Sequence, residues 1–410
     1  MIMDEIAYKI MKTKYYGKMV IWLPKILLGL VVMWPKAKVS LMRRFIVTSG
    51  SIFIISFTAI GLLNTLNFTF ESINHNLIGS LLIMSCFQGV SKIILMSIKF
   101  KDIADIIDNI SLKFWPDDLT GYVEVDEEIK KFYIFTMSTC LVFLGTVAVF
   151  FSIFFITPLL IEERILPFNV EYSFDWKVSP NYELIYLSQV FYVHILALYV
   201  IGTDFFYLCT VVSVIIQFKI LQQCLSLLNS NEMVEIMNKL DINNIIKSDK
   251  MDDLCKEYLK KCVKHHLLLL RFIKKLNAVF NLIILTEWST VMLSMCLLIY
   301  MLVQNYAVNT FFETALALSM VIAYLQQLAF YCIVGSIFNY QINLLPEHLF
   351  GSKWIVINNE IKKDLTFVLQ HSQQNLTLNV YNIYELNMVS YLQVLKLAFS
   401  VYTLFSNVSN

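Results

Sequence analysis

His194, Asp204 and Glu287 are ionisable side chains that interrupt otherwise apolar stretches of this sequence, and Lys92 and Lys396 lie in two further stretches. Inside a membrane, such groups can relay protons along a transport path. They can also make structural hydrogen bonds between helices. Because the three positions are isolated from one another along the chain, we favour the structural role and expect Asp204 and Glu287 near the inner ends of their spans, close to water.

The other reactive side chains form no catalytic pattern. The sequence lacks GxSxG, HExxH and GxxxxGK[ST] motifs and any glycine-rich turn suited to phosphate. His265 and His266 are adjacent, so they cannot both face one metal ion on a helix, and we expect both to be solvated. The cysteines match no zinc-site spacing, and none lies in an expected outer loop, which predicts buried thiols without disulfides: Cys86, Cys140, Cys209, Cys224, Cys255, Cys262, Cys296 and Cys332. We therefore expect no enzyme, no cofactor and no metal.

The composition indicates which kind of structure must position these side chains. Hydrophobic residues make up 58% of the 410 residues and charged residues 15%, whereas a soluble domain is about 45–50% apolar and about 25% charged. One soluble core cannot hide such a surplus, so lipid must cover the remainder. The net charge of +1 gives no reason to expect nucleic acid as a partner.

Seven stretches are long and apolar enough to cross a bilayer, which takes roughly 20 residues. We therefore predict an all-α membrane protein with seven transmembrane helices: Phe45–Leu63, Asn76–Met96, Phe132–Ile161, Leu184–Phe218, Leu276–Val303, Thr314–Leu345 and Leu386–Val408. There are no linkers or repeats, so the chain reads as a single domain over 1–410. It divides into an amino-terminal segment (1–44), six spans with their loops (45–345), an anchor helix region (346–380) and a last helix (381–410).

The distribution of basic residues predicts the orientation of these spans. Of the 32 Lys and Arg residues, 28 lie in the segments 1–44, 99–131, 219–275 and 346–380. The alternate connections 64–75, 162–183 and 304–313 hold only Arg164 and Lys177. Basic residues are retained on the cytoplasmic side, so we predict an amino terminus inside the cell and a carboxyl terminus outside.

Two helices are expected in the cytoplasmic part. Apolar residues recur at helical spacing from Leu254 to Leu276, which predicts one long helix over 251–303 whose cytoplasmic half packs against other helices. A second apolar stripe comprises Ile357, Ile361, Leu365 and Val368. Periodicity alone leaves two roles open for it, packing in a cytoplasmic assembly or lying on the membrane surface.

Several motifs, most of them in the carboxyl-terminal third, are more specific. Ala329–Gln341 reads AFYCIVGSIFNYQ, Asp364–Val380 reads DLTFVLQHSQQNLTLNV, and Ser390–Phe405 reads SYLQVLKLAFSVYTLF. Trp354 follows the first of these by about twenty residues, and Gly29–Pro35 reads GLVVMWP. In order and spacing these segments resemble the insect odorant receptor family across essentially the whole chain. The departure from the family pattern is Val401, where an aromatic residue is usual.

The resemblance implies a function. Members of this family are understood to form tetrameric ligand-gated cation channels. These channels are expected in the plasma membrane of the dendrites of olfactory sensory neurons. An odorant-binding subunit assembles with a shared co-receptor subunit, and the seventh helices line one central pore. The co-receptor carries a large insertion in the connection that corresponds here to 219–275; this chain lacks it, so the resemblance implies an odorant-binding subunit in a heterotetramer.

The last helix supplies the predicted pore residues. Positions three and four residues apart share one face of a helix, and this face mixes polar and apolar groups: Gln393, Leu397, Ser400, Leu404, Asn407 and Val408. An apolar constriction can gate by dewetting. By their place in the closing motif, Leu404 and Val408 match the family's hydrophobic gate and Asn407 its pore amide; ordinary helix packing is the alternative for the two apolar residues.

The resemblance places a lateral odorant pocket in the outer halves of the second, third, fourth and sixth spans. The residues there suit a volatile, mostly apolar ligand held by aromatic walls: Met84, Phe87, Val142, Gly145, Val149, Tyr192, Ile195, Tyr199, Tyr324 and Gln327. For any single one of them, plain core packing is the alternative.

Three other functions remain to be weighed. A gustatory-type channel subunit would share the architecture, but the residues from Val401 to Val408 do not match the TYxxxxQF ending of that family. A non-conducting chemoreceptor would signal through a partner. A transporter is disfavoured because the sequence shows no internal repeats and no Gly/Pro signals of broken helices.

Overall fold

The long helices follow the predicted apolar stretches. The computed structural model describes residues 21–35, 40–68, 73–160, 164–168, 172, 174–240, 251–304, 311–372, 377–381 and 383–409. Within them, one long helix covers each predicted span: α4 (Leu41–Phe68), α5 (Ile73–Ile98), α7 (Val123–Leu160), α8 (Asn181–Ser226), α10 (Met251–Gln304), α11 (Phe311–Asn343) and α14 (Met388–Ser409). The prediction of an all-α chain with seven long helices is confirmed. Five helices, those containing Gly79–Ile98, Val123–Leu160, Asn181–Ser226, Met251–Ile299 and Thr314–Phe350, meet the length and hydropathy that a membrane span requires, and Met388–Val401 is a shorter apolar helix.

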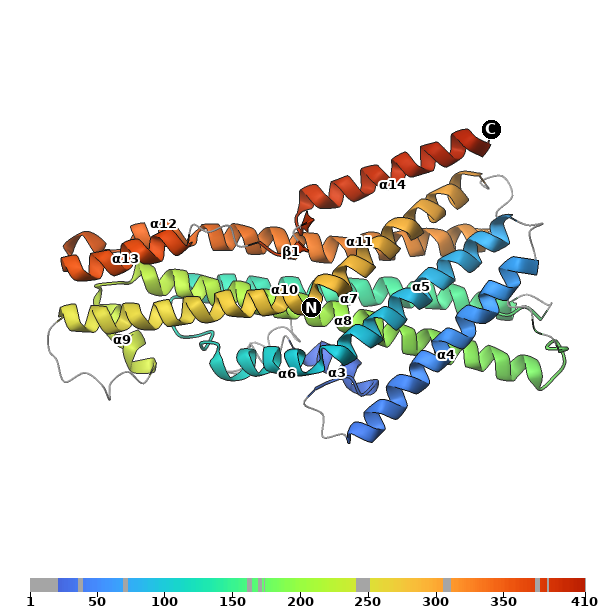
Figure 1. Ribbon diagram of the computed structural model, residues 1–410, viewed down its shortest axis with the longest axis horizontal. Helices are drawn as coiled ribbons and strands as arrows, with labels where there is room; N and C mark the ends of the chain where they lie inside the picture. Colours follow the sequence, from blue (N-terminus) through green and yellow to red (C-terminus); the bar gives the residue numbers. More distant parts are fainter. Residues whose placement is uncertain are drawn as a thin grey trace.

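Shorter elements complete the chain. They are α3 (Trp22–Leu30), α6 (Phe100–Asp108), the π-helix η1 (Asn109–Lys113), α9 (Asn231–Lys239), α12 (Leu345–Phe350), the 3₁₀-helix η3 (Trp354–Val356) and α13 (Asn359–Ser372). One antiparallel pair of two-residue strands, β1 (Asn379–Val380) and β2 (Tyr384–Glu385), precedes α14. The molecule is elongated, with α9, α12 and α13 at one end and α4, α5 and α14 in the other half (Figure 1).

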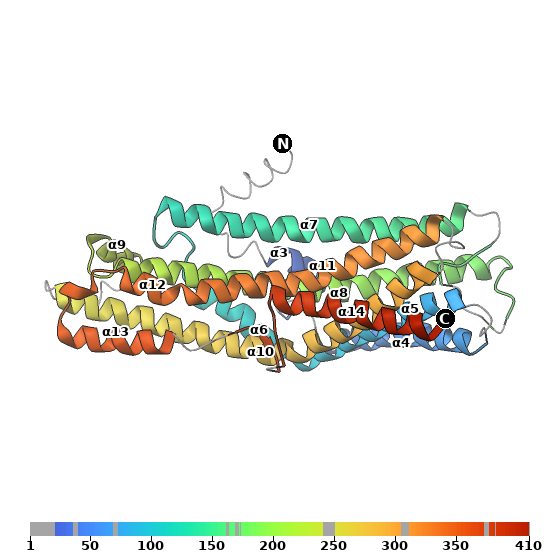
Figure 2. The same ribbon diagram turned by 90° about the horizontal axis from the view of Figure 1, so that it is seen from above.

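Helix α8 is the central element of the bundle. From Ile201 to Phe218 every side chain is buried, because α3, α4, α5, α7, α10, α11 and α12 all contact it. A helix that is apolar on all sides is stable only when it is surrounded in this way. Helix α7, by contrast, lies along one side of the bundle (Figure 2).

The amino-terminal GLVVMWP segment folds against α8. Leu28 of α3 lies so close to Gly202 that a side chain on this glycine would contact it at 2.9 Å. A positive φ of 60° at Val32 reverses the chain after α3. The Trp34 ring then packs edge-on against Phe206, with the ring centroids 6.0 Å apart. The motif is therefore a packing element.

The two helices expected in the cytoplasmic part are both present, as α10 and α13. The long helix over 251–303 is confirmed as α10. The stripe of Ile357, Ile361, Leu365 and Val368 is buried, and α13 contacts α12 and α10, so this stripe packs within the protein. All eight cysteines are free and buried, as predicted.

The expectation that His265 and His266 are solvated is wrong. Their side chains are 4% and 6% exposed. His265 stacks on Trp115, with 3.8 Å between the ring centroids and 9° between the planes. The Gln217 side chain holds the backbone of Trp115 through hydrogen bonds of 2.8 and 3.0 Å. The loop after η1 therefore covers this face of α10, which a helical-wheel argument could not anticipate.

Candidate ligand pocket

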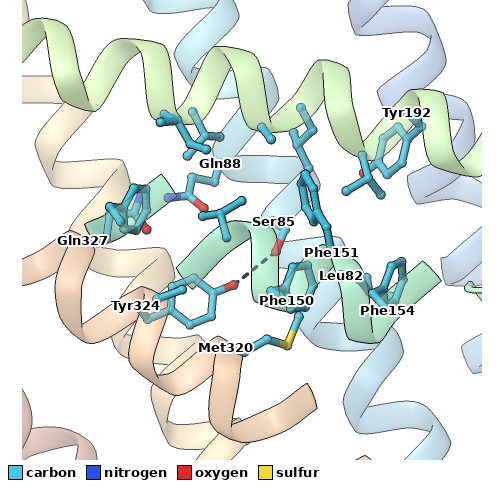
Figure 3. A pocket seen from close by; sticks show the side chains of 18 of the residues that line it. Leu82, Ser85, Gln88, Phe150, Phe151, Phe154, Tyr192, Met320, Tyr324 and Gln327 are labelled. Carbon is cyan, nitrogen blue, oxygen red and sulfur yellow. Dashed lines mark hydrogen bonds between the residues drawn. The ribbon is translucent and has the colours of Figure 1, made fainter. Parts of the chain in front are cut away.

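A cavity lies between α5, α7, α8 and α11 (Figure 3). Its empty space is about 840 Å³, which includes space continuous with the surroundings. Most of its wall is apolar, as in typical small-molecule sites. The lining residues are Leu82, Ser85, Gln88, Phe143, Val147, Phe150, Phe151, Phe154, Phe168, Tyr192, Val193, Leu196, Ala197, Val200, Ile201, Met320, Ala323, Tyr324 and Gln327.

Helical periodicity explains how the sequence builds this wall. On α7 the lining residues run from Phe143 through Val147, Phe150 and Phe151 to Phe154, steps of mostly three and four residues that keep them on one face. The rings also contact each other: Phe150 and Phe154 stack at 5.5 Å. The face that turns toward the cavity is thus the phenylalanine-rich face of α7.

Three of the ten predicted pocket residues line this cavity, namely Tyr192, Tyr324 and Gln327. The other seven are not on its wall: Met84, Phe87, Val142, Gly145, Val149, Ile195 and Tyr199. The elements are the predicted ones; both residues predicted on α11 line the cavity, whereas those predicted on α5 and α7 lie on other faces of their helices.

The individual positions show this rotation. Phe87, Val142 and Val149 are 55%, 60% and 56% exposed and point away from the bundle. The side of α7 at Gly145 is open, with no atom within 4 Å of where a Cβ would stand. Tyr199 turns toward α4, where its hydroxyl bonds to Ser51 at 3.2 Å. The aromatic spacing from Phe143 to Phe154 was the signal that could have identified the α7 wall from sequence.

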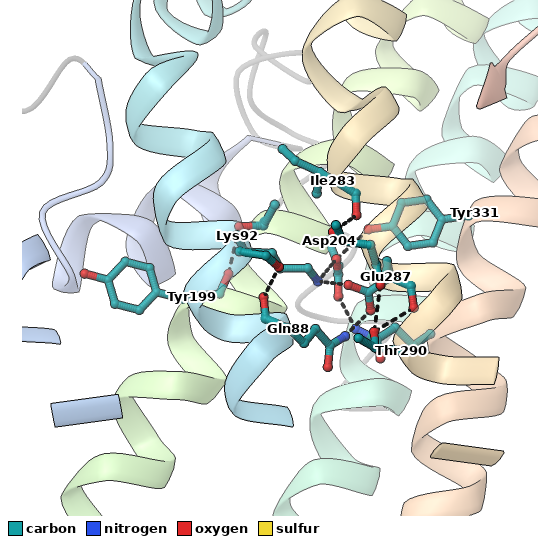
Figure 4. Close-up of polar contacts among 12 residues, drawn as sticks. Gln88, Lys92, Tyr199, Asp204, Ile283, Glu287, Thr290 and Tyr331 are labelled. Atoms are coloured by element: carbon teal, nitrogen blue, oxygen red, sulfur yellow. Dashed lines mark hydrogen bonds and ion pairs between the residues drawn. The ribbon is translucent and has the colours of Figure 1, made fainter. Parts of the chain in front are cut away.

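Charged residues are buried directly beside the cavity (Figure 4). The Lys92 Nζ of α5 lies 2.6 Å from Asp204 Oδ1 on α8 and 2.7 Å from Glu287 Oε2 on α10. Each of these three residues is 1% exposed. The expectation of isolated groups near water is wrong for Asp204 and Glu287, because helix packing brings both onto one ammonium group.

Polar side chains complete this cluster. Tyr331 of α11 donates its hydroxyl hydrogen to Asp204 at 2.5 Å, and Gln327 Nε2 donates to the same carboxylate at 2.7 Å. Gln88 Nε2 donates to Glu287. An ionised group inside a membrane is costly unless paired. Because the partners come from α5, α8, α10 and α11, the structural role predicted for Asp204 and Glu287 is confirmed, and the cluster fastens these four helices to one another.

His194 is separate from this cluster. Its imidazole stacks with Phe155, with the ring centroids 5.6 Å apart. In the part of the chain that the structure describes, no group of three or more His, Cys, Asp and Glu side chains could hold a metal ion. The interactions of the Lys92–Asp204–Glu287 cluster are hydrogen bonds and ion pairs.

The last helix shows two unlike faces in its first half. Val394 and Ala398 are buried, on the side of α14 that packs against α10 and α11. Gln393, Leu397 and Ser400 are exposed. The other predicted pore residues, Leu404, Asn407 and Val408, belong to the helical backbone of α14, but their side chains lie outside the described part.

A bundle of long apolar helices with a buried ion cluster and an aromatic cavity is typical of a multi-pass membrane protein that binds a small molecule. The particular family follows from comparison: the model described as "7tm Odorant receptor" matches residues 72–399. The chain belongs to this family of odorant receptors, and it is not an enzyme.

Individual relatives agree with this. The chain is 21% identical over 264 residues to Odorant receptor Or2 of Anopheles gambiae and 24% identical over 267 residues to Odorant receptor 10 of Aedes albopictus. Each alignment covers 64% of this chain and 66% of the relative, so the chain spans just under two thirds of these relatives' length.

A solved structure shares the fold. The insect olfactory receptor OR5 from Machilis hrabei superposes with a TM-score of 0.75 over 96% of this chain and 100% of that one, at 14% identity. A second structure of that receptor, in complex with eugenol, gives 0.76 over the same shares of both chains, also at 14% identity.

Proposed function

We propose that this chain is the odorant-binding subunit of a ligand-gated, non-selective cation channel. The observation that carries the proposal is the cavity between α5, α7, α8 and α11, whose phenylalanine-rich wall and few polar groups suit a volatile, mostly apolar ligand. The related OR5 of Machilis hrabei has been solved in complex with eugenol, a small volatile phenol, which supports a ligand of this kind.

The pore would form between subunits. Four copies of α14 around an axis would bring Gln393, Leu397 and Ser400, which are exposed in the single chain, to the channel lining. Leu404 and Val408 would form the apolar gate and Asn407 the adjacent amide ring. A ligand that binds the open arrangement more tightly shifts the population toward it.

The proposal extends to assembly and location, which membership of the family supports. We propose a heterotetramer with a co-receptor subunit in the plasma membrane of olfactory neuron dendrites, with the amino terminus inside and the carboxyl terminus outside. The placement of 28 of 32 basic residues in alternate connections supports this orientation. The lack of a large insertion between α8 and α10 supports the odorant-binding role.

Whole-cell current tests the proposal. The chain is expressed with and without an insect co-receptor and exposed to a broad panel of volatiles. We expect inward current that requires both the co-receptor and an odorant. A tastant-evoked current would favour the gustatory-type alternative. Volatile binding without current in excised patches would favour a non-conducting receptor.

The gate assignment has its own test, a Leu404→Ser substitution. A polar side chain hydrates the constriction, so we expect a resting current several-fold above that of the unaltered channel, measured without odorant. The matched control is Leu397→Ser, about two helical turns earlier on the same face of α14, which should change conductance more than resting current. Unchanged resting current in Leu404→Ser at equal surface expression contradicts the gate.

A further inference from the structure

Five polar side chains interrupt the apolar wall of the cavity: Ser85, Gln88, Tyr192, Tyr324 and Gln327. A ligand can hydrogen-bond only with the hydrogens and lone pairs that the protein has not already used. The hydrogen bonds behind the wall therefore decide which ligand chemistry the cavity accepts.

The two glutamines are held in one orientation by the buried charges. Gln88 Nε2 donates to Glu287, and Gln327 Nε2 donates to Asp204 at 2.7 Å. An ionised carboxylate only accepts hydrogen bonds, so each amide must turn its nitrogen, and cannot turn its oxygen, toward the negative charge. Among the described residues these are the side-chain hydrogen bonds of the two amides, and both side chains line the cavity (Figure 3). Their oxygens are therefore free acceptors for a ligand, and each nitrogen keeps one further hydrogen.

The hydrogens of two hydroxyl groups, those of Ser85 and Tyr324, are also committed. Ser85 donates its single hydrogen to the carbonyl oxygen of Leu81, one helical turn earlier, at 3.1 Å. Its oxygen must then accept the hydrogen of the Tyr324 hydroxyl, 3.1 Å away. The Tyr192 hydroxyl pairs with Cys86 Sγ. The lone pairs of Tyr324 remain available, and its hydrogen does not.

The hydrogen bonds to the carboxylates make the amide oxygens of Gln88 and Gln327 stronger acceptors. An amide whose N–H donates to a carboxylate carries more negative charge on its oxygen, because linked hydrogen bonds polarise one another. A ligand hydroxyl would extend the chain from its O–H, through the amide, to Asp204 or Glu287. An ether oxygen in the same place has no hydrogen to donate to these amide oxygens.

We infer that this cavity selects apolar volatiles that carry a hydroxyl group, alcohols or phenols, over isomers of equal size whose oxygen is an ether. The inference rests on the proposed function, because it assigns the ligand class of the same pocket. A site that pairs with a ligand hydroxyl discriminates strongly against an analogue that lacks it, since the buried acceptors are then left without a partner.

Isomer pairs test this directly. Phenethyl alcohol and benzyl methyl ether share one formula, as do octanol and methyl heptyl ether, and in each pair only the alcohol donates a hydrogen. With the chain and a co-receptor expressed together, we expect each alcohol to reach half-maximal current at a concentration at least about tenfold lower than its ether, the effect of one net hydrogen bond. Equal potencies, or more potent ethers, overturn the inference.

A substitution sharpens the test. Ser85→Ala removes the acceptor of the Tyr324 hydroxyl, so its O–H becomes free to donate to an ether oxygen, and the alcohol-to-ether ratio should fall several-fold. Ser97→Ala is the matched control: Ser97 lies on the same helix and makes the same bond to a carbonyl one turn earlier, to Ile93 at 2.7 Å, and it does not line the cavity. An unchanged ratio in Ser85→Ala at normal surface expression overturns the assignment of donors and acceptors.

Failure of the inference and failure of the proposed function are separable. Ligand-induced shifts in the thermal stability of the purified full-length chain measure binding without current. A shift with the alcohols, a much smaller one with the ethers and no current would uphold the inference and contradict the channel. Current with equal potencies would uphold the channel and contradict the inference.

Discussion

At the scale of single residues, Lys92 holds two buried negative charges in the interior of this receptor. Its ammonium group faces two carboxylates, Asp204 and Glu287, and the side chains of all three are almost completely buried. Pairing offsets the cost of removing each charge from water only while every partner is present. The cluster is therefore a point at which α5, α8, α10 and α11 must meet correctly.

We expect Lys92→Met to be strongly destabilising. The apolar side chain fills similar space but leaves two buried carboxylates without a counter-charge, a cost of about 3–5 kcal/mol. Thermal unfolding of the purified chain and the fraction that reaches the cell surface measure it. Lys101→Met, an exposed lysine of α6, should change stability by no more than about 0.5 kcal/mol. Equal stability of both variants would mean that the carboxylates need no counter-charge.

At the scale of elements, the junction between α11 and α14 gives the YCxxG motif a physical meaning. Tyr331 bonds to Asp204. At Gly335, a side chain would stand 2.0 Å from the Leu386 carbonyl oxygen. The next residue, Ser336, accepts a hydrogen bond from the Met388 N–H at 3.0 Å, and this bond holds the start of α14. The motif thus connects the ion cluster to the last helix.

Gly335→Ala should therefore displace the beginning of α14. Overpacking of this kind costs about 1–3 kcal/mol, and we expect both lower thermal stability and a smaller odorant-evoked current. Gly145→Ala is the control, because a Cβ there meets nothing within 4 Å and alanine favours the helix. The interpretation of the motif is wrong if the two alanine variants behave alike.

At the scale of the whole molecule, the last helix leaves one face without a partner in the single chain. Leu397 is 45% exposed, whereas Val394 is 9% exposed. Figure 1 shows α14 at the edge of the molecule, rising away from α11 toward its carboxyl end. Only an assembly of several subunits could enclose a pore against this face.

Cysteine accessibility distinguishes a water-filled pore from lipid at this face. We expect a positively charged methanethiosulfonate to reduce the odorant-evoked current of Leu397→Cys by more than half, because a thiol in water reacts as thiolate. Val394→Cys, on the packed face, should be unaffected. The eight native cysteines are buried and give a low background. A Leu397→Cys channel that is insensitive to the reagent would place this face in lipid.

The sequence by itself determined the properties that depend on neighbouring residues. The length of an apolar run fixes a span, and helical spacing fixed α10 as one helix and the stripe from Ile357 to Val368 as a packed face. The positions of basic residues predict an orientation. Motifs such as YCIVG, Tyr331–Gly335, identified the family. All of these are local patterns, and the helices that they specify formed where expected.

Only the tertiary structure decided how each helix is rotated about its axis and which distant residues meet. Phe87 and Val142 lie on the expected helices but face outward, because the packing of α5 and α7 against α8 selects the opposite faces. Lys92, Asp204 and Glu287 lie on three helices far apart in the sequence, so no spacing rule links them. Their contact follows from the requirement that buried charges be paired, and that requirement can be met only after the helices have packed.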